Sequence, residues 1–374
     1  MPPGRPARVV FLIPLAELLG GSERALHDYL MRVDRARIAA HVVFLAEGTQ
    51  PDRLRSAGFG VHVIPSGRLR QVRAFLRATR AIGRLLRRLE PDLLVSWDAQ
   101  PHLYASAARL ARRVPAIWWQ HGIPDPRAPV TRIATALPVR EVGAWSQASA
   151  RAQGRVAPRR TTFVVHPGVA PPPAEADPRT RAELGLPAGR FVVGVVGRLI
   201  PWKRQDAVIR AVSAARRQGI DAHLVVVGGD AYGLAPEYPA LLRRTAAEEE
   251  VADAVTFVGQ VASPWPFLRA MDVSVNASLA EPFGIALTES MAVGTPVVAM
   301  DGGGPREIIT SGVDGLLVAP GDDAALTAAI VRLARDPAYT ARLAEAALQT
   351  FIARFHVDAF VEGLTRELER LARA

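Results

Sequence analysis

The sequence predicts an α/β protein built from two doubly wound, Rossmann-like domains. Short apolar runs rich in β-branched residues alternate with longer segments of helical periodicity along almost the whole chain. This pattern is typical of parallel sheets covered by helices on both faces. A chain of 374 residues is also longer than one hydrophobic core usually supports. Residues 167–173 contain four prolines in seven positions, which favours a stiff connector between two domains.

Thirteen apolar runs are predicted strands, because each is short and lies between helix-patterned segments. In the first half of the chain they are residues 8–13, 41–45, 61–64, 93–97, 116–120, 141–145 and 162–166. In the second half they are residues 191–196, 222–227, 254–258, 273–276, 296–299 and 315–318.

The domain boundaries follow from this order. We expect a first domain over residues 1–170, a proline-rich linker over 171–189, a second domain over 190–355 and a last helical segment over 356–374. Open α/β sheets bind ligands at the carboxyl ends of their strands. Two such domains therefore predict a central cleft that both sheets face.

The composition excludes several classes of protein. There is no cysteine, so disulfides, thiolate metal sites and a cysteine nucleophile are ruled out. No run of 18 apolar residues is free of charge and proline, and the apolar stretch near the start is too short for a signal peptide. We therefore expect a cytoplasmic protein. The net charge of +10 favours anionic partners, but no nucleic-acid-binding motif is present.

Lys203 is the single lysine among the 46 basic residues. It lies five positions after Arg198, in a glycine-containing turn that follows the predicted strand 191–196. Two cations in such a turn can hold a phosphate, and lysine supplies a compact, mobile charge where arginine supplies a rigid fork. The alternative is that one lysine survived by chance on a solvated helix start. The residues alone leave both interpretations open.

Two carboxylates follow the predicted strand 273–276. Glu281 and Glu289 lie eight positions apart, and Gly284 stands where a helix would begin. The first backbone amides of that helix would be donors without an intrahelical partner, which suits a diphosphate. Taken without context, Glu281 could equally be a helix-capping acid and Glu289 a surface acid.

The order of these motifs resembles the retaining, GT-B-fold nucleotide-sugar glycosyltransferases of glycosyltransferase family 4. The resemblance covers nearly the whole chain and is dense in its second half. Beyond Gly-Arg-x4-Lys and Glu-x7-Glu, the matching segments are residues 290–299, Gly303-Gly304-Pro305-Arg306-Glu307, residues 314–318, Gly20-Gly21-Ser22-Glu23 and Gln120-His121-Gly122. One departure is His166 before Pro167 and Gly168, where the family commonly has an asparagine, so His166 inherits no role.

The resemblance implies a donor site in the second domain. Arg198 and Lys203 match the cations that hold the donor diphosphate, and Glu289 matches the carboxylate that accepts from the ribose hydroxyls. Glu281 matches the group that grips the donor sugar, together with backbone amides. The residues that complete the predicted donor site are Phe283, Gly284, Ile285 and Val258, at the end of the strand 254–258.

In the first domain, the resemblance makes Gly21 a glycine of close approach and places His121 near the reaction centre. Gly20-Gly21 could equally be a turn before a helix capped by Ser22, and a histidine at a strand end is often an ordinary loop residue. A ring nitrogen of His121 can bond a sugar hydroxyl without acting as a base. The catalytic group predicted from the sequence is thus His121, Arg198, Lys203 and Glu281.

We expect no metal and no cofactor. Many sugar-transfer enzymes hold a metal ion with an Asp-x-Asp motif, which this chain lacks. Arg198, Lys203 and a helix N-terminus would then stabilise the leaving diphosphate in place of the ion. The last helix is expected to pack back on the first domain, as the resemblance implies.

Residues 69–90 form a predicted basic amphipathic helix, with arginines at spacings of three and four along one face. One interpretation is a surface for anionic lipid or an anionic acceptor, with peripheral contact at the inner membrane face. The other interpretation is a solvated outer face, which is rich in arginine because this sequence uses arginine for almost all of its basic residues.

The function expected from these observations is retaining transfer of a sugar from a nucleoside-diphosphate sugar to an acceptor hydroxyl. The acceptor, whether glycan, lipid-linked glycan or natural product, is not specified by the sequence. Two alternatives are a nucleotide-sugar epimerase on the same fold and a non-catalytic GT-B-like partner protein. The first would need further acid–base carboxylates, and the second would tend to lose the donor-binding residues.

Overall fold

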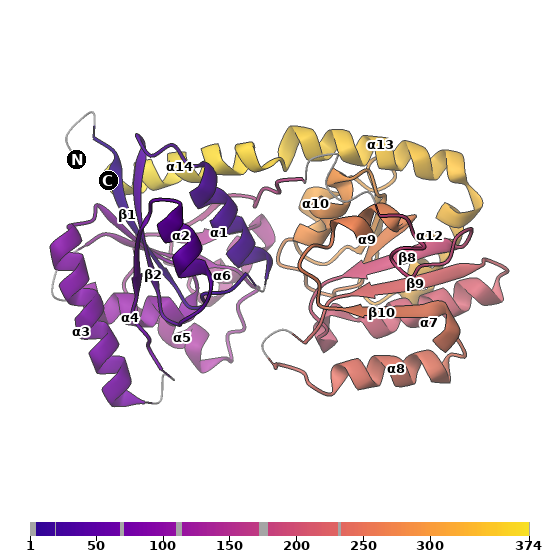
Figure 1. Cartoon of the computed structure of the whole chain (residues 1–374), viewed down its shortest axis with the longest axis horizontal. Helices are drawn as coiled ribbons and strands as arrows, with labels where there is room; N and C mark the ends of the chain where they lie inside the picture. The colour runs from indigo at the N-terminus through magenta and orange to yellow at the C-terminus, as the bar shows by residue number, and fades with distance from the viewer. Residues whose placement is uncertain are drawn as a thin grey trace. The chain divides into compact units, whose positions relative to one another are not determined.

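The protein consists of two compact units in a computed structural model (Figure 1), which describes residues 5–18, 20–67, 71–109, 114–171, 179–230 and 233–373. The first unit is Met1–Gly168 together with Val357–Ala374. The second unit is Val169–His356. Each unit is a parallel sheet with helices on its faces, as the alternating sequence pattern predicts.

The first unit contains a seven-stranded parallel sheet in the order β3-β2-β1-β4-β5-β6-β7. Its strands are β1 (Ala7–Ile13), β2 (Ile38–Phe44), β3 (Gly60–Val63), β4 (Leu93–Ser96), β5 (Ala116–Gln120), β6 (Val142–Ala144) and β7 (Thr162–Val164). Its helices are α1 (Gly21–Arg32), α2 (Gln50–Ser56), α3 (Val72–Leu89), α4 (Ala99–Arg109), α5 (Pro129–Ala136), α6 (Gln147–Val156) and α14 (Val357–Arg373).

The second unit contains a six-stranded parallel sheet in the order β10-β9-β8-β11-β12-β13. Its strands are β8 (Phe191–Val196), β9 (Ala222–Val227), β10 (Val255–Gly259), β11 (Val273–Asn276), β12 (Val297–Met300) and β13 (Leu316–Val318). Its α-helices are α7 (Gln205–Arg217), α8 (Tyr238–Glu248), α9 (Trp265–Ala270), α10 (Ile285–Ala292), α11 (Pro305–Ile308), α12 (Asp323–Arg335) and α13 (Pro337–Arg354), with 3-10 turns η1 (Pro201–Lys203) and η2 (Ala252–Ala254).

All thirteen predicted strands form, and the predicted class of two doubly wound α/β units is confirmed. The strands read as continuous apolar runs because helices cover both faces of each sheet. The largest difference is at β2, which begins at Ile38, three residues before the prediction. Ile38 pairs with Ala7 at the start of β1, so pairing with the central strand extends β2 towards its amino end.

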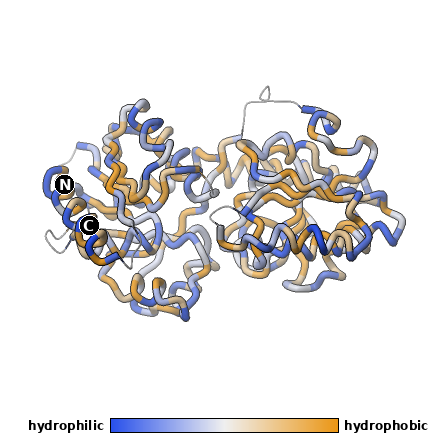
Figure 2. Tube along the Cα trace, turned by 60° about the horizontal axis from the view of Figure 1, so that its bottom comes forward, coloured by the Kyte–Doolittle hydropathy of each residue, from blue (hydrophilic) through white to orange (hydrophobic). Residues whose placement is uncertain are grey.

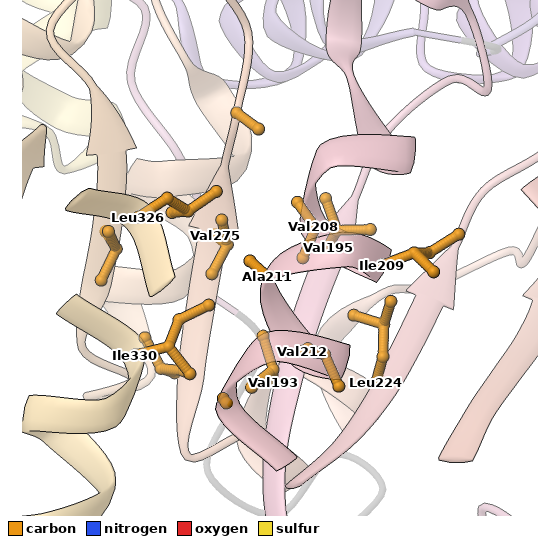
Figure 3. Packing of buried hydrophobic residues seen from close by; sticks show 14 of the residues in the cluster. Val193, Val195, Val208, Ile209, Ala211, Val212, Leu224, Val275, Leu326 and Ile330 are labelled. Atoms are coloured by element: carbon orange, nitrogen blue, oxygen red, sulfur yellow. The ribbon is translucent and has the colours of Figure 1, made fainter. Parts of the chain in front are cut away.

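The core of the second unit lies between its sheet and the helices α7 and α12. Val193 and Val195 of β8 face Val208 and Val212 of α7, while Leu326 and Ile330 of α12 pack nearby (Figure 3). These side chains are almost fully buried. Burying a side chain of this kind contributes about 1.5–3 kcal/mol. Hydrophobic positions follow the central strands of each unit in Figure 2.

Part of the predicted linker belongs to the second unit. Leu184 and Leu186 are buried against Val192 and Phe267, because their apolar side chains cover the face of the sheet opposite α7. Residues 172–178 of the predicted linker lie outside the described part of the chain.

The last helix, α14, packs on the first unit, against α1 and β1. The hydroxyls of Tyr29 and Thr365 lie 3.2 Å apart in the core. Near the surface, Arg37 bridges Glu362 and Glu369 at 2.7 and 2.8 Å. A helix that follows the second unit in sequence therefore completes the core of the first.

The predicted basic helix is present as α3, and its arginine face is exposed. Ile82 and Leu86 are buried beneath it, whereas Val72 and Leu76 are 66% and 41% exposed. Leu69 and Arg70, which the prediction includes, lie outside the described residues. Within the described residues no helix is long and apolar enough to span a bilayer.

Candidate functional site

The two sheets each change direction at one place in their strand order. In the first unit this is the boundary between β1 and β4, and in the second it is the boundary between β8 and β11. Loops that leave neighbouring strands in opposite directions open a crevice at the carboxyl edge, where α/β proteins bind ligands. Arg198 and Lys203 follow β8, and Glu281 follows β11. The predicted donor residues therefore lie at the switch point of the second sheet.

The backbone fixes the segment that carries Arg198 and Lys203. Gln205 donates a 2.8 Å hydrogen bond to the Arg198 carbonyl oxygen, and Leu199 donates to the carbonyl of Gly229 after β9. The segment ends in a 3-10 turn, and Arg204 then adopts φ 53° before α7 begins. A left-handed conformation is uncommon for arginine, and its ion pair with Asp323 at 2.9 Å holds it in place.

Lys203 and Glu281 form an ion pair with 2.5 Å between the Lys203 Nζ and the Glu281 Oε2. The two side chains are only 17% and 7% exposed. The ammonium also lies 4.5 Å from the centre of the Trp202 ring, where a cation–π contact stabilises it. This buried geometry argues against the interpretation that Lys203 survived by chance on a solvated helix start.

Glu281 is a buried, ionised carboxylate held by three donors. Its Oε2 accepts hydrogen bonds from Asn276 Nδ2 and Ser278 Oγ, both at 3.0 Å, in addition to Lys203. Burial alone would raise the pKa of Glu281, but the charge of Lys203 and the three hydrogen bonds outweigh burial, and the pKa lies below its ordinary value. Among the described residues, the other oxygen, Oε1, has no hydrogen-bond partner. This oxygen can accept from a ligand.

A glycine-rich turn supports the loop that carries Glu281. The Glu281 amide donates to the Gly302 carbonyl at 2.9 Å, and the Gly304 amide donates back to the Glu281 carbonyl at 2.8 Å. Gly303 has φ 98°, and a Cβ there would lie 2.3 Å from the Glu281 carbonyl oxygen. Only glycine permits this close approach. The Gly303-Gly304 motif therefore positions the Glu281 carboxylate by holding the backbone of that residue.

The helix α10 begins at Ile285 with Gly284 as its N-cap at φ 112°, as the sequence predicts. The first amides of α10 have no preceding turn to bond and are directed out of the helix end. Phe283 is buried, with its ring 5.9 Å from that of Phe355, so this residue can offer a ligand only its backbone. Glu289 is 7% exposed and is not a surface acid. Val258 is partly buried in β10.

In the first unit, Gly21 is the first residue of α1, after an extended Gly20. This helix also begins at the carboxyl edge of its sheet. The carbonyl of Ser22 accepts from Trp97 Nε1 at 3.2 Å, which ties the start of α1 to the end of β4. Glu23, in the first turn of α1, has a buried Oε2 without a hydrogen-bond partner in the described structure.

His121 follows β5 and has both ring nitrogens engaged. Trp145 Nε1 donates to His121 Nδ1 at 2.7 Å. An indole N–H can only donate, so Nδ1 is the acceptor and the neutral ring carries its proton on Nε2. That nitrogen lies 3.2 Å from the Trp97 carbonyl oxygen and donates to it. Burial lowers the pKa of His121 to about 4, although the charge of Glu23 and the bond to Trp97 act in the opposite direction.

The structure thus assembles two groups of predicted residues, one in each unit. Lys203, Glu281 and Gly284 lie around the switch point of the second sheet. In the first unit, Trp97 bonds both His121 and Ser22, the residue that follows Gly21. No group of three or more His, Asp or Glu side chains in the described residues could hold a metal ion.

Three contributors were missed by sequence reasoning: Asn276, Ser278 and Trp145. Asn276 and Ser278 lie two residues apart at the end of β11, where a polar pair after an apolar strand is a signal that could have been read. Trp145 gives no comparable signal, because an aromatic residue at a strand end usually denotes core packing.

Two family models match successive parts of the chain. Residues 19–172 match Glycosyltransferase Family 4, and residues 176–350 match Glycosyl transferases group 1. The lipopolysaccharide core biosynthesis glycosyltransferase LpsD of Rhizobium meliloti is 30% identical over 290 residues, which cover 75% of this chain and 76% of LpsD. The chain belongs to the GT-B glycosyltransferases of family 4, and the predicted family is confirmed.

More similar sequences match a shorter segment. A D-inositol 3-phosphate glycosyltransferase of Acidothermus cellulolyticus is 41% identical over 196 residues, covering 50% of this chain and 42% of that protein. The chain spans about half the length of the relatives of this kind that it matches. Among solved structures, Anabaena Alr3699/HepE in complex with UDP and glucose aligns with a TM-score of 0.85 at 27% identity, covering 96% of this chain and 98% of the Anabaena protein.

Proposed function

We propose that the protein is a retaining, metal-independent glycosyltransferase that transfers a sugar from a nucleoside-diphosphate sugar to an acceptor hydroxyl. The observation that carries this proposal is the buried Lys203–Glu281 pair at the β8–β11 switch point, beside the N-terminus of α10. Family membership supports it, as does the likeness to a protein solved with UDP-glucose.

In this proposal the diphosphate binds at the N-terminus of α10. The amides of Phe283, Gly284 and Ile285 donate to its oxygens, and the helix dipole adds about half a positive charge. Arg198 and Lys203 approach from the loop after β8. These groups are fixed before the ligand arrives, so little reorganisation accompanies bond cleavage.

Glu281 then serves the donor sugar. Its Oε2 is saturated by Lys203, Asn276 and Ser278, which leaves Oε1 as an acceptor for the sugar hydroxyls. Because the pKa of Glu281 is low, the carboxylate stays ionised at neutral pH and does not act as a general acid. Glu289 would accept from the ribose hydroxyls, and Val258 would line the nucleotide.

Lys203 begins with its charge compensated by Glu281. When the donor binds, an anionic phosphate oxygen can share the ammonium, which has three donor hydrogens. As the glycosidic bond breaks, negative charge grows on that oxygen and the contact strengthens. The same cation therefore holds both the carboxylate and the leaving group.

The chemical step proposed is front-face substitution. The bond between the anomeric carbon and the diphosphate oxygen breaks, and the acceptor oxygen forms its bond to the same face of that carbon. The proton of the acceptor hydroxyl passes to the leaving phosphate oxygen. His121 is neutral and bonded at both ring nitrogens, so in this proposal its Nε2–H would exchange the Trp97 carbonyl for a sugar hydroxyl near the reaction centre. It would not remove a proton.

The first test measures donor binding and product configuration. UDP should raise the melting temperature by mass action, and UDP-glucose should be turned over in the presence of an acceptor glycan. Proton NMR of the first-formed product should show the anomeric configuration of the donor. An inverted anomer would refute the front-face mechanism and leave the family assignment intact.

A donor-turnover assay with and without acceptors separates the two alternative functions. An epimerase would change the donor sugar without transferring it, and a non-catalytic partner would leave the donor unchanged. Acceptor-dependent release of UDP is the result expected for the proposed transferase.

Metal independence is tested with a chelator. Lys203, Arg198 and the amides of α10 already supply positive charge to the diphosphate in this proposal, so activity should persist in excess EDTA. A strict requirement for added Mg²⁺ or Mn²⁺ would show that these groups do not suffice.

A further inference from the structure

A second cationic site lies in the first unit, on helices that the proposed reaction does not use. A groove of about 710 Å³ runs between α5 and the segment that follows α6. Four arginines line it: Arg132, Arg155, Arg159 and Arg160. None of the side chains that line it is acidic.

One of these arginines is fixed by the fold. Arg160 donates to the main-chain oxygens of Ala136, Leu137 and Val139, at 3.3, 2.9 and 3.5 Å. These are carbonyls at and just beyond the end of α5, which lack intrahelical partners. Arg160 therefore contributes a positive charge that cannot move away from the groove.

The other three arginines are uncommitted. Arg132, Arg155 and Arg159 are exposed, and within the described residues none of them forms a hydrogen bond or an ion pair. Elsewhere on the same unit, some surface arginines form ion pairs: Arg37 pairs with two glutamates, and Arg370 pairs with another two. Among the described residues, the groove arginines lack the countercharge that Arg37 and Arg370 have, as do the exposed arginines of α3, but in the groove they gather around one hollow with the fixed Arg160.

The helix ends nearby do not supply enough negative charge to balance the groove. The carboxyl ends of α5 and α6 each carry about half a negative charge, against four guanidinium groups. We propose that the groove binds a phosphate group, whose charge and tetrahedral oxygens match several arginine donors at once. The groove residues belong to the first unit and the donor residues to the second.

The test uses a variant that removes charge and little else. In Arg155→Gln/Arg159→Gln, both side chains stay polar and of similar length, and no intramolecular bond is lost. Titration with inorganic phosphate at constant ionic strength, followed by calorimetry, should show binding that this variant weakens by roughly tenfold or more, because two charge-assisted contacts are removed.

Two controls define the site. Arg73→Gln/Arg77→Gln removes the same charge from exposed positions on α3 and should alter the affinity by less than about twofold, since screening weakens distant charges. Lys203→Ala should leave the groove's phosphate binding intact and affect only the donor site. Failure of this proposal therefore leaves UDP binding, and the proposed function, untouched.

A vesicle assay distinguishes a lipid headgroup from a soluble phosphorylated ligand. Flotation with phosphatidylglycerol vesicles, compared with phosphatidylcholine vesicles, tests whether membrane binding depends on Arg155 and Arg159. Dependence in both assays supports the site with a lipid headgroup as its ligand, and dependence in the phosphate titration alone supports the site with a soluble one. If neither binding depends on these two arginines beyond the α3 control, the proposal is wrong.

Discussion

At the scale of single residues, the choice of lysine at position 203 follows from the space around Glu281. Asn276 and Ser278 already bond Oε2, and the ammonium reaches the same oxygen as a third donor. A guanidinium prefers to grip both carboxylate oxygens in a fork. An arginine here would compete for Oε1, the oxygen that we assign to the sugar.

We therefore expect Lys203→Ala to lower the transfer rate by roughly two orders of magnitude or more, because one preorganised charge donor is lost. It should also lower the urea midpoint, since removing one partner of a buried pair costs about 3–5 kcal/mol. Lys203→Arg should recover only part of the rate. Steady-state kinetics and urea unfolding measure both effects, and an alanine variant of full activity would remove Lys203 from the proposed site.

A second prediction concerns the protonation of His121. Its pKa of about 4 lies below the value near 6.5 expected in the unfolded chain. Between these values the unfolded chain binds a proton that the folded protein does not, so stability falls as pH drops from about 6.5 towards 4. The pKa of His102 is also lowered to about 4 by burial and by nearby arginines, so both histidines contribute.

The variant His121→Gln isolates one of these contributions. It should reduce the dependence of stability on pH over this range while retaining the part due to His102. Urea unfolding at several pH values measures the slope. An unchanged slope would mean that His121 is not held neutral by the fold.

At the scale of elements, the sequence specified the strands well and the site only in part. A buried parallel strand is a local apolar run, so all thirteen could be located from the local sequence pattern alone. The N-terminus of α10 could also be predicted from the sequence, because Gly284 precedes a helical pattern. The hydrogen bond between Trp145 and His121 could not be predicted, because these residues meet only when β5 and β6 pair in the sheet.

A substitution at Gly303 tests whether this turn positions the loop that carries Glu281. Gly303→Ala should weaken UDP-glucose binding and lower the melting temperature, because the added Cβ would lie 2.3 Å from the Glu281 carbonyl oxygen and displace its loop. Gly294→Ala is a matched control. It also has positive φ, at 72°, but its Cβ would meet no atom within 4 Å, so only backbone strain of about 1 kcal/mol is expected.

If Gly303→Ala and Gly294→Ala weaken binding equally, strain alone explains the effect. The close approach of Gly303 to the Glu281 carbonyl would then not contribute to UDP-glucose binding. Calorimetric titration of both purified variants with UDP-glucose makes the comparison.

At the scale of the whole molecule, the order of the chain links the two units twice. The chain leaves the first unit after Gly168 and returns to it at Val357, and α14 then packs against α1 and β1. Two connections placed close together in this way are suited to a hinge, where a few residues absorb a change of angle.

We therefore predict that a nucleoside diphosphate compacts the protein. Closing around the donor would exclude water, which competes with the acceptor for the reactive sugar. Small-angle scattering should show a smaller radius of gyration with UDP than without it, and Lys203→Ala should show a reduced change. An identical radius under both conditions would contradict closure on nucleotide binding.

The Lys203–Glu281 pair has a further consequence for chemical labelling. Apart from the terminal amine, the chain holds only one primary amine, at Lys203, and that side chain is mostly buried between a carboxylate and an indole ring. An acylating reagent should therefore mark a single internal position, slowly in the folded protein. The mass of one peptide would then show whether a nucleotide protects Lys203, as the proposed donor site requires.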